Sequence, residues 1–250
     1  MSDGDSPTRE SDGDQLLFVG TGSPLAPAFS TSVLLNGTLL FDAPGGITYR
    51  LKQEDVDVED IDAIFLTHYH GDHFLGLPNL LLNNMFRERP LHIVGPHDPE
   101  AKTRALLDLS FKQQVDLILD NANVEFHGVD GEISDESIPP VNFHSYRLDH
   151  EEEPAYGYRL GLTNGQFGIT GDTTECPNLE RLLDDSDFAV VDMTFEETTD
   201  THLGVEYVKT IHQRFGVERV FAVHRSMEIY DEVTSIPDTI LPTDGEVYDL

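Results

Sequence analysis

The chain has 250 residues and a formal net charge of −32 at pH 7, because 47 Asp and Glu outweigh 15 Lys and Arg. This balance excludes a strongly basic protein that binds nucleic acid or a membrane surface through its net charge. Hydrophobic residues make up 38% of the chain, which excludes a wholly disordered protein. No apolar run reaches the roughly 18 residues of a membrane span.

The acidic excess with few lysines resembles proteins of halophiles that accumulate salt, in which carboxylates keep the protein hydrated. An acidic interaction surface is the alternative interpretation. The N-terminal segment has no apolar stretch typical of a secretory signal, and the single cysteine, Cys176, excludes an internal disulfide. We therefore expect a cytoplasmic protein with a disordered acidic tail at residues 1–14 and one folded domain at 15–250.

Apolar runs separated by turn residues predict the elements of this domain. Asn36-Gly37 between two such runs predicts a hairpin. Strands are expected at 16–19, 32–35, 39–42, 61–66, 91–94, 141–148, 155–161, 166–170, 188–191 and 219–223. Helices are expected at 47–52, 74–85, 98–119, 178–183 and 205–215. Hairpins come first and helices then interleave with strands, which predicts an α+β domain of two packed sheets covered by helices.

The strongest chemical signal is an H-x-H-x-D-H motif directly after the strand at 61–66. It is formed by His68, His70, Asp72 and His73. At a strand end the first two histidines point to the same face, and the turn at Gly71 lets the last two residues reach a second point nearby. This geometry suits two cations in one pocket better than a closed structural site. The spacing argues against the alternative of a polar loop with hydrogen-bonded histidines.

The motif resembles that of the metal hydrolases with the metallo-β-lactamase fold. The surrounding sequence is similar to the branch that contains ribonuclease Z and the cyclic phosphodiesterase of phosphonate breakdown. The similarity extends over about residues 16–230 and is carried by FVGTGSP at 18–24, LFD at 40–42 and HFLGLP at 73–78. It implies a four-layer αββα sandwich, in which Asp42 supports a ligand histidine.

The resemblance also implies the remaining ligands, each of which follows an apolar run. The first metal would be held by His68, His70 and His150. The second metal would be held by Asp72, His73 and His224, with Asp172 bridging the two metals. Two divalent ions are expected, Zn²⁺ as the best fit to the histidine-rich set and Mn²⁺ or Fe²⁺ as alternatives. In this family a metal-bridging hydroxide attacks the substrate, and Asp72 is placed to bind a metal and orient that water.

Further residues are assigned less directly. His202 precedes a helix where the resembling enzymes carry a histidine that assists the leaving group, with a surface histidine as the alternative. Asp192 follows a strand and is the candidate to orient it, although ribonuclease Z usually has glutamate there. Cys176 lies either near the site or in the core. Structural or exposed roles are expected for the other histidines, which are His92, His97, His127, His144 and His212.

Ribonuclease Z enzymes that mature transfer RNA carry a flexible arm, commonly inserted after the Gly-Tyr-Arg segment. Here Gly157-Tyr158-Arg159 is followed too closely by Gly171-Asp172-Thr173 to contain an arm. The predicted function is therefore a dinuclear metal-dependent phosphodiesterase of the ribonuclease Z-like kind that does not efficiently process transfer RNA.

There are two alternatives. One is a thioesterase or lactonase of the same superfamily, and the other is a metal-binding scaffold in an RNA-processing or regulatory assembly. The expected partner is a phosphodiester substrate, either a small molecule or RNA, with no membrane. A homodimer is left open. The basic stretch from Arg87 to Lys112 is interpreted either as an anion-attracting lip or as an ordinary solvated face.

Overall fold

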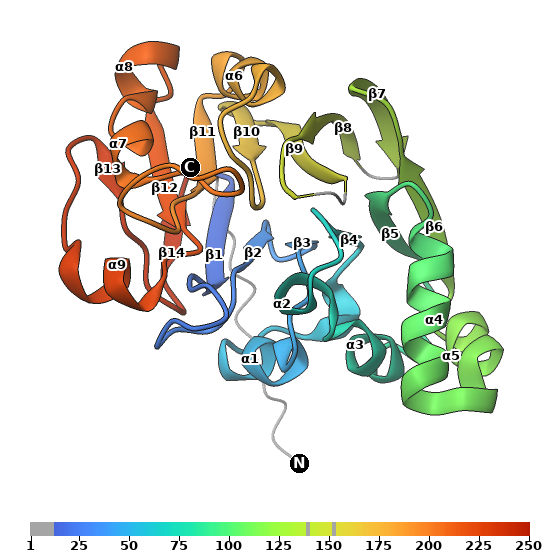
Figure 1. Cartoon of the computed structure of the whole chain (residues 1–250). Helices are drawn as coiled ribbons and strands as arrows, with labels where there is room; N and C mark the ends of the chain where they lie inside the picture. The colour runs from blue at the N-terminus through green and yellow to red at the C-terminus, as the bar shows by residue number, and fades with distance from the viewer. Residues whose placement is uncertain (1–12, 139–140, 152–153) are drawn as a thin grey trace.

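The computed structural model describes residues 13–138, 141–151 and 154–250. In this part of the chain the strands form two seven-stranded sheets, and helices cover the outer faces of both (Figure 1). This arrangement confirms the predicted αββα sandwich. None of the described helices is long and apolar enough to cross a membrane.

The first sheet has the strand order β14-β1-β2-β3-β4-β5-β6. Its strands are β1 (Gln15–Gly20), β2 (Ser32–Leu35), β3 (Leu39–Phe41), β4 (Ala63–Phe65), β5 (Leu91–Pro96), β6 (Val124–Val129) and β14 (Val247–Asp249). β2 and β3 form the predicted hairpin, in which Asn36 and Gly37 both have the positive φ that a tight turn of this kind requires. From β3 to β6 the strands are parallel.

The second sheet has the order β13-β12-β11-β10-β9-β8-β7. Its strands are β7 (Ile133–Ile138), β8 (Val141–Leu148), β9 (Ala155–Leu162), β10 (Gly165–Ile169), β11 (Phe188–Asp192), β12 (Arg219–Val223) and β13 (Thr239–Ile240). β10, β11 and β12 are parallel, and β8 runs in the same direction because β9 is antiparallel to both β8 and β10. The carboxyl ends of these four strands therefore meet at one edge of the sheet.

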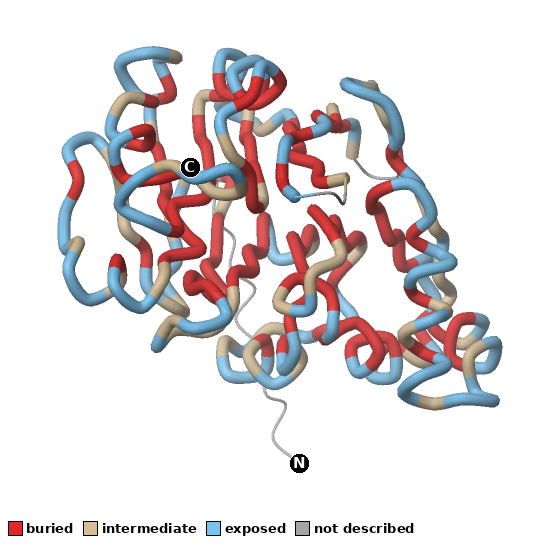
Figure 2. The backbone as a smooth tube through the Cα atoms, viewed as in Figure 1, coloured by how far each residue is buried: buried red, intermediate tan, exposed pale blue. Residues whose placement is uncertain are grey.

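The helices pack in two groups. They are α1 (Ile47–Gln53), η1 (Val58–Asp60), α2 (Gly71–Phe74), α3 (Leu77–Asn83), α4 (Pro99–Phe111), η2 (Lys112–Gln114), α5 (Val115–Asn121), α6 (Pro177–Asp184), α7 (Val205–Val208), α8 (Ile211–Phe215) and α9 (Met227–Glu232). α1, α3, α4 and α5 bury apolar side chains against the first sheet, and α6 to α9 against the second. A third apolar core fills the space between the sheets, so the central strands are buried and the outer helix faces are exposed (Figure 2).

The helix predicted at 74–85 is interrupted near its start, because helical hydrogen bonding stops between α2 and α3. The backbone N–H of Gly76 donates to Ala43 O at 2.8 Å instead of continuing the helix. A Cβ added to Gly76 would lie 2.0 Å from Pro44 O, so only glycine allows this close approach. The break brings the loop that contains Asp42 against the metal-binding motif.

Two other predicted helices are also divided. The helix at 98–119 becomes α4, η2 and α5, because Lys112 has a φ of +50° and stops the helical hydrogen bonding. The helix at 205–215 becomes α7 and α8, with Thr210 between them. Apolar periodicity continues across each break, because the successive helices face the same sheet.

The tail predicted at residues 1–14 lies, up to residue 12, outside the described residues. Its last residue, Asp14, is buried instead of disordered. The carboxylate of Asp14 accepts hydrogen bonds from the Asn36 side chain at 2.8 Å and from Thr163 N at 2.7 Å. Asp14 therefore belongs to the folded body, because its charge is matched by donors from both sheets.

Gly76→Ala is expected to lower the free energy of unfolding by about 1–3 kcal/mol, the usual cost of forcing extra volume into a packed site. The clash is with backbone, so it cannot be relieved by a side-chain rotation. Gly45→Ala is the matched control, since a Cβ there meets no atom within 4 Å. Chemical denaturation of both variants measures the difference, and equal stability would contradict the packing argument.

Candidate metal centre

The candidate site residues follow the carboxyl ends of strands from both sheets. His68 lies shortly after β4, and His150, Asp172 and His224 follow β8, β10 and β12. The three strands of the second sheet end at the same edge, so segments far apart in sequence meet there. The structure thus brings together all the residues of the predicted ligand set.

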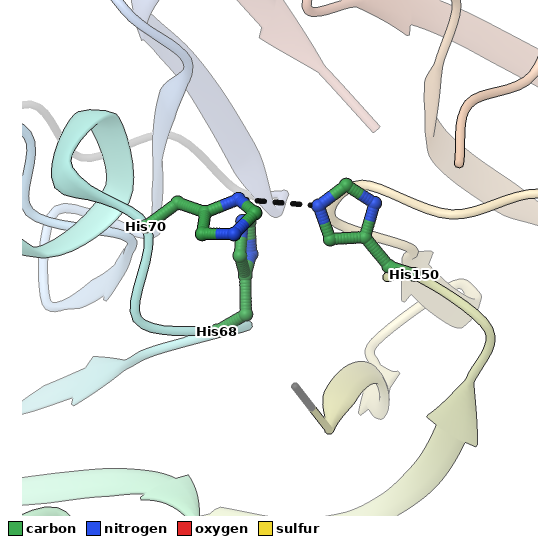
Figure 3. Close-up of side chains that lie close together, drawn as sticks. All are labelled: His68, His70 and His150. Carbon is green, nitrogen blue, oxygen red and sulfur yellow. Dashed lines mark hydrogen bonds between the residues drawn. The ribbon is translucent and has the colours of Figure 1, made fainter. Parts of the chain in front are cut away.

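The first group consists of three histidines, His68, His70 and His150. Their ligand atoms all lie within 4.8 Å of one another. Figure 3 shows His68 and His70 on one segment, turned toward His150 on the opposing segment. His70 Nδ1 and His150 Nε2 are 3.2 Å apart, a separation that suits two ligands of one metal ion.

The second group consists of Asp72, His73, Asp172 and His224, again with ligand atoms within 4.8 Å. Asp172 Oδ2 is 3.4 Å from His73 Nε2 and 3.3 Å from His224 Nε2. The same oxygen is 3.9 Å from His68 Nε2, which belongs to the first group. Asp172 therefore lies between the two groups.

Hydrogen bonds fix the proton on Nδ1 of several of these histidines. Asp42 accepts from His73 Nδ1 at 2.7 Å, and the carbonyl of Thr201 accepts from His150 Nδ1 at 2.8 Å. The hydroxyl of Thr67 donates to Asp42, so it accepts from His68 Nδ1 at 3.0 Å. In the neutral form of each histidine the lone pair is then on Nε2, which faces the cluster as metal-binding histidines require.

The buried histidines offer a direct test of whether the residues fit a metal ion. His68 Nε2 and His73 Nε2 are buried and have no hydrogen-bond partner. A buried polar atom without a partner costs about 1–3 kcal/mol, unless a ligand satisfies it. Nitrogen donors beside ionised carboxylates fit a divalent cation. A bound cation would give these two nitrogens the partner that they lack.

The pKa values of the cluster residues are shifted in different directions. Burial lowers the pKa of His68 well below its ordinary value, and the neighbouring His73 acts in the same direction. Burial acts to raise the pKa of Asp172, but the charges of His224 and His73 outweigh it and hold this pKa well below its usual range. Burial likewise opposes the ionisation of Asp72, but His224 and His73, whose Nε2 atoms lie 3.2 Å and 3.3 Å from its Oδ2, outweigh it and lower the pKa. Burial acts to lower the pKa of His73, but the charges of Asp172 and Asp42 outweigh it and raise this pKa well above its ordinary value. Since neutral imidazoles and ionised carboxylates are the forms that bind metals, His73 must release a proton when a cation binds.

The backbone around the cluster is held in uncommon conformations. Asp42 and His224 have φ values of 59° and 57° although neither is glycine. Such conformations cost about 1–3 kcal/mol each and are concentrated at functional sites. Gly171, just before Asp172, has a φ of +62°, and a Cβ there would lie 2.5 Å from Thr67 Cβ. The loop after β10 can therefore approach the histidine motif only with glycine at this position.

His202 and Asp192 lie next to the metal cluster and contact each other. His202 Nδ1 is 2.9 Å from Asp192 Oδ2. Burial acts to lower the pKa of His202, but the hydrogen bond and charge of Asp192 outweigh it and raise the pKa above its ordinary value. His202 stacks on His224 with ring centroids 5.3 Å apart, so it lies beside the second ligand group.

Thr194 links these two residues to the cluster and was not among the predicted site residues. Its hydroxyl donates to Asp192 Oδ1 at 2.6 Å, so it accepts from His224 Nδ1 at 2.8 Å. The same oxygen is 3.1 Å from His202 Nδ1. The only sequence signal is its place two residues after β11, because a threonine is not itself a usual metal ligand.

Comparison with known proteins identifies the family. A model of the beta-lactamase superfamily domain matches residues 38–225. The chain belongs to the beta-lactamase superfamily. Ribonuclease Z of Staphylococcus carnosus (strain TM300) is 30% identical over 168 residues, which cover 62% of this chain and 52% of that protein. The chain thus spans about half the length of the curated relatives it matches.

Solved structures agree with this membership and confirm the metallo-β-lactamase fold. A metallo-β-lactamase fold protein from Bacillus subtilis superimposes with a TM-score of 0.77 at 16% identity, covering 96% of this chain and 100% of that chain. A diphosphatase from the PhnP family superimposes with a TM-score of 0.75 at 21% identity, covering 95% and 98% of the two chains. These likenesses establish the fold of this superfamily member.

The structure also bears on two further sequence hypotheses. Cys176 is buried in the apolar core between the second sheet and its helices, which agrees with the packing interpretation. Arg89 pairs with Asp62 at 2.6 Å, Arg104 pairs with Glu100 and Asp116, and Arg87 donates to neighbouring backbone carbonyls. Carboxylates neutralise Arg89 and Arg104, and Arg87 is buried, so these three arginines do not form an anion-attracting lip.

Proposed function

We propose that the chain is a phosphodiester hydrolase that uses two divalent cations, with Zn²⁺ as the best fit to its ligands. The observation that carries the proposal is the position of Asp172 Oδ2, between nitrogens of both ligand groups at 3.3–3.9 Å. His68, His70 and His150 would hold one cation, and Asp72, His73 and His224 the other. When bound, the pair supplies an ionised water near neutral pH and neutralises charge on the phosphoryl group.

The protein's own side chains would orient the reactants. Asp72 Oδ2 lies 3.2 Å from His224 Nε2 and 3.3 Å from His73 Nε2, and the side chain remains 15% exposed. It can therefore accept a hydrogen bond from the attacking water while it holds a cation. His202, with Nδ1 fixed by Asp192, would donate a proton from Nε2 to the leaving oxygen.

His202→Ala is expected to lower kcat about 10²–10⁴-fold, the usual contribution of a general acid. The loss should be largest for a diester with an alkoxide leaving group, and it should shrink for a nitrophenolate that leaves without protonation. Measuring kcat for both substrates gives this comparison. His212→Ala is the control, because His212 is exposed and bonds Val217 O before the amino end of β12, whereas His224 follows the carboxyl end of that strand. Equal losses on both substrates would exclude proton donation.

The size of the adjoining cavity supports a small substrate. A cavity of about 410 Å³ opens beside His150 and is lined by Arg147, Asp149, Glu151 and Asp200, among others. This volume is typical of small-molecule sites. Three of these side chains are carboxylates, so a polyanion would be repelled along this wall.

The connection between β9 and β10 supports the same substrate class. The two strands pair up to Leu162 and Gly165, so only residues 163–164 link them. The transfer-RNA arm of the resembling enzymes therefore has no counterpart at this position. One structural neighbour, from the PhnP family, is a diphosphatase.

A panel of substrates tests the proposed function. We expect hydrolysis of a chromogenic phosphodiester in concentrated KCl with zinc or manganese, and no efficient 3′ cleavage of precursor transfer RNA. A thioester and a lactone are included because those activities are the enzymatic alternatives. Accurate cleavage of the precursor at the rate of an arm-bearing enzyme would overturn the substrate assignment. Faster turnover of the thioester or lactone would favour those classes, and binding of metal without any hydrolysis would favour a scaffold.

A further inference from the structure

A second cluster of metal-binding residue types lies away from the catalytic end of the sandwich. It consists of His92 on β5 and of Glu125 and His127 on β6, whose ligand atoms are within 4.8 Å of one another. In register, His92 lies opposite Ala63, the first residue of β4, whereas His68 follows the end of that strand. Extended chain between Ala63 and His68 spans about 16 Å at roughly 3.3 Å per residue, so this cluster is separate from the candidate active site.

The distances within the cluster match those between ligands of one ion. His92 Nδ1 is 3.0 Å from His127 Nε2 and 3.5 Å from Glu125 Oε2. Nitrogen and oxygen ligands at about 2.0–2.2 Å from a tetrahedral zinc ion lie about 3–3.5 Å from each other. The three ligand atoms therefore need little movement to bind one cation.

Burial and charge also favour a cation at this position. His92 is 5% exposed, so its side of the cluster is buried. The Glu125 side chain is 54% exposed, so the cluster is open to solvent on that side. Glu136 on β7 adds a second carboxylate charge near His127. Burial and His92 act to lower the pKa of His127, and the charges of Glu125 and Glu136 oppose them. Two imidazoles and two carboxylates thus offer a cation both nitrogen ligands and negative charge.

We propose that His92, Glu125 and His127 bind a third divalent ion of the borderline class that Zn²⁺ represents. Two imidazoles and one carboxylate with an open side suit such ions. β6 and β7 are the outermost strands at one side of the two sheets. An ion at this position ties β5 to β6 beside that open side, so its role is structural and does not depend on the proposed hydrolase activity.

Zinc content measures the proposal directly. The protein and its variants are dialysed against micromolar free zinc chloride, and bound zinc is determined by mass spectrometry of the elements. We expect His127→Gln to bind one zinc ion per chain fewer than the parent. His144→Gln is the matched control, because His144 is a partly exposed histidine of β8 that pairs with Asp135 outside the cluster. It should bind as much zinc as the parent.

Glu125→Gln provides a second variant that keeps the fold, since its side chain is largely exposed. Loss of a group that only supports a metal ligand usually weakens metal binding by roughly tenfold or more. The third zinc ion should therefore bind to Glu125→Gln at least roughly tenfold more weakly than to the parent. The rise in melting temperature on adding zinc should also be smaller in both variants than in the parent. Equal zinc content and equal zinc-induced stabilisation in the parent, His127→Gln and Glu125→Gln would overturn the proposal and leave a simple histidine–histidine hydrogen bond.

Discussion

Replacing Asp72 by alanine is expected to lower kcat by more than the roughly 10²–10⁴-fold that a general acid contributes. Asp72 Oδ2 lies within 3.3 Å of both His73 and His224, so its removal affects the second ligand group and the orientation of the water together. His202 assists only the leaving group. The order of activity should therefore be parent, His202→Ala and then Asp72→Ala, measured as kcat on one diester.

Folding and metal content are the controls for this experiment. The circular dichroism of both variants should match that of the parent, because Asp72 is partly exposed on the short helix α2. Asp108→Ala, at an exposed carboxylate within α4, should retain full activity. If Asp72→Ala were as active as His202→Ala, Asp72 would have no role beyond that of one assisting group.

Removing divalent metal is expected to lower the melting temperature by about 8–16 °C. A ligand at 1,000 times its Kd stabilises the folded state by about 4 kcal/mol. For a chain of this size each kcal/mol corresponds to roughly 2–4 °C. The physical cause is the cluster itself, in which buried nitrogens without partners face two carboxylates.

The comparison requires constant KCl, because the net charge of −32 makes stability depend on salt. Re-addition of zinc or manganese should restore the melting temperature. Repeating the titration with His127→Gln separates the contribution of the proposed third ion. A melting temperature that responds to neither chelator nor metal would contradict the assignment of the ligands.

Much of the architecture could be predicted from apolar runs, but edge strands could not. β7 has the sequence ISDESI and buries only its last residue, so it carries no apolar alternation. β6 lies at the edge of its sheet, so it is only partly buried, and a glycine interrupts its apolar pattern. Helix breaks were missed where the cause is tertiary, as at Gly76, which approaches the backbone of the preceding loop.

The ligand-type residues of the site could be predicted because their chemistry is specific and each follows a strand. The residues that hold them in place could not. Thr67 and Thr194 act by passing a hydrogen bond from an imidazole to a carboxylate, and this role has no sequence spacing of its own. The pair of His92 and His127 was also missed, because parallel strands bring the two together across 35 positions of sequence.

The number of ions held by the catalytic cluster tests the central claim most directly. Native mass spectrometry of the chain, equilibrated at nanomolar free zinc so that the more open third site stays empty, counts them. The paired ligand groups around Asp172 predict two zinc ions per chain, and Asp172→Ala should lose at least one. A chain that carries no metal and still hydrolyses the diester at the full rate would contradict the account.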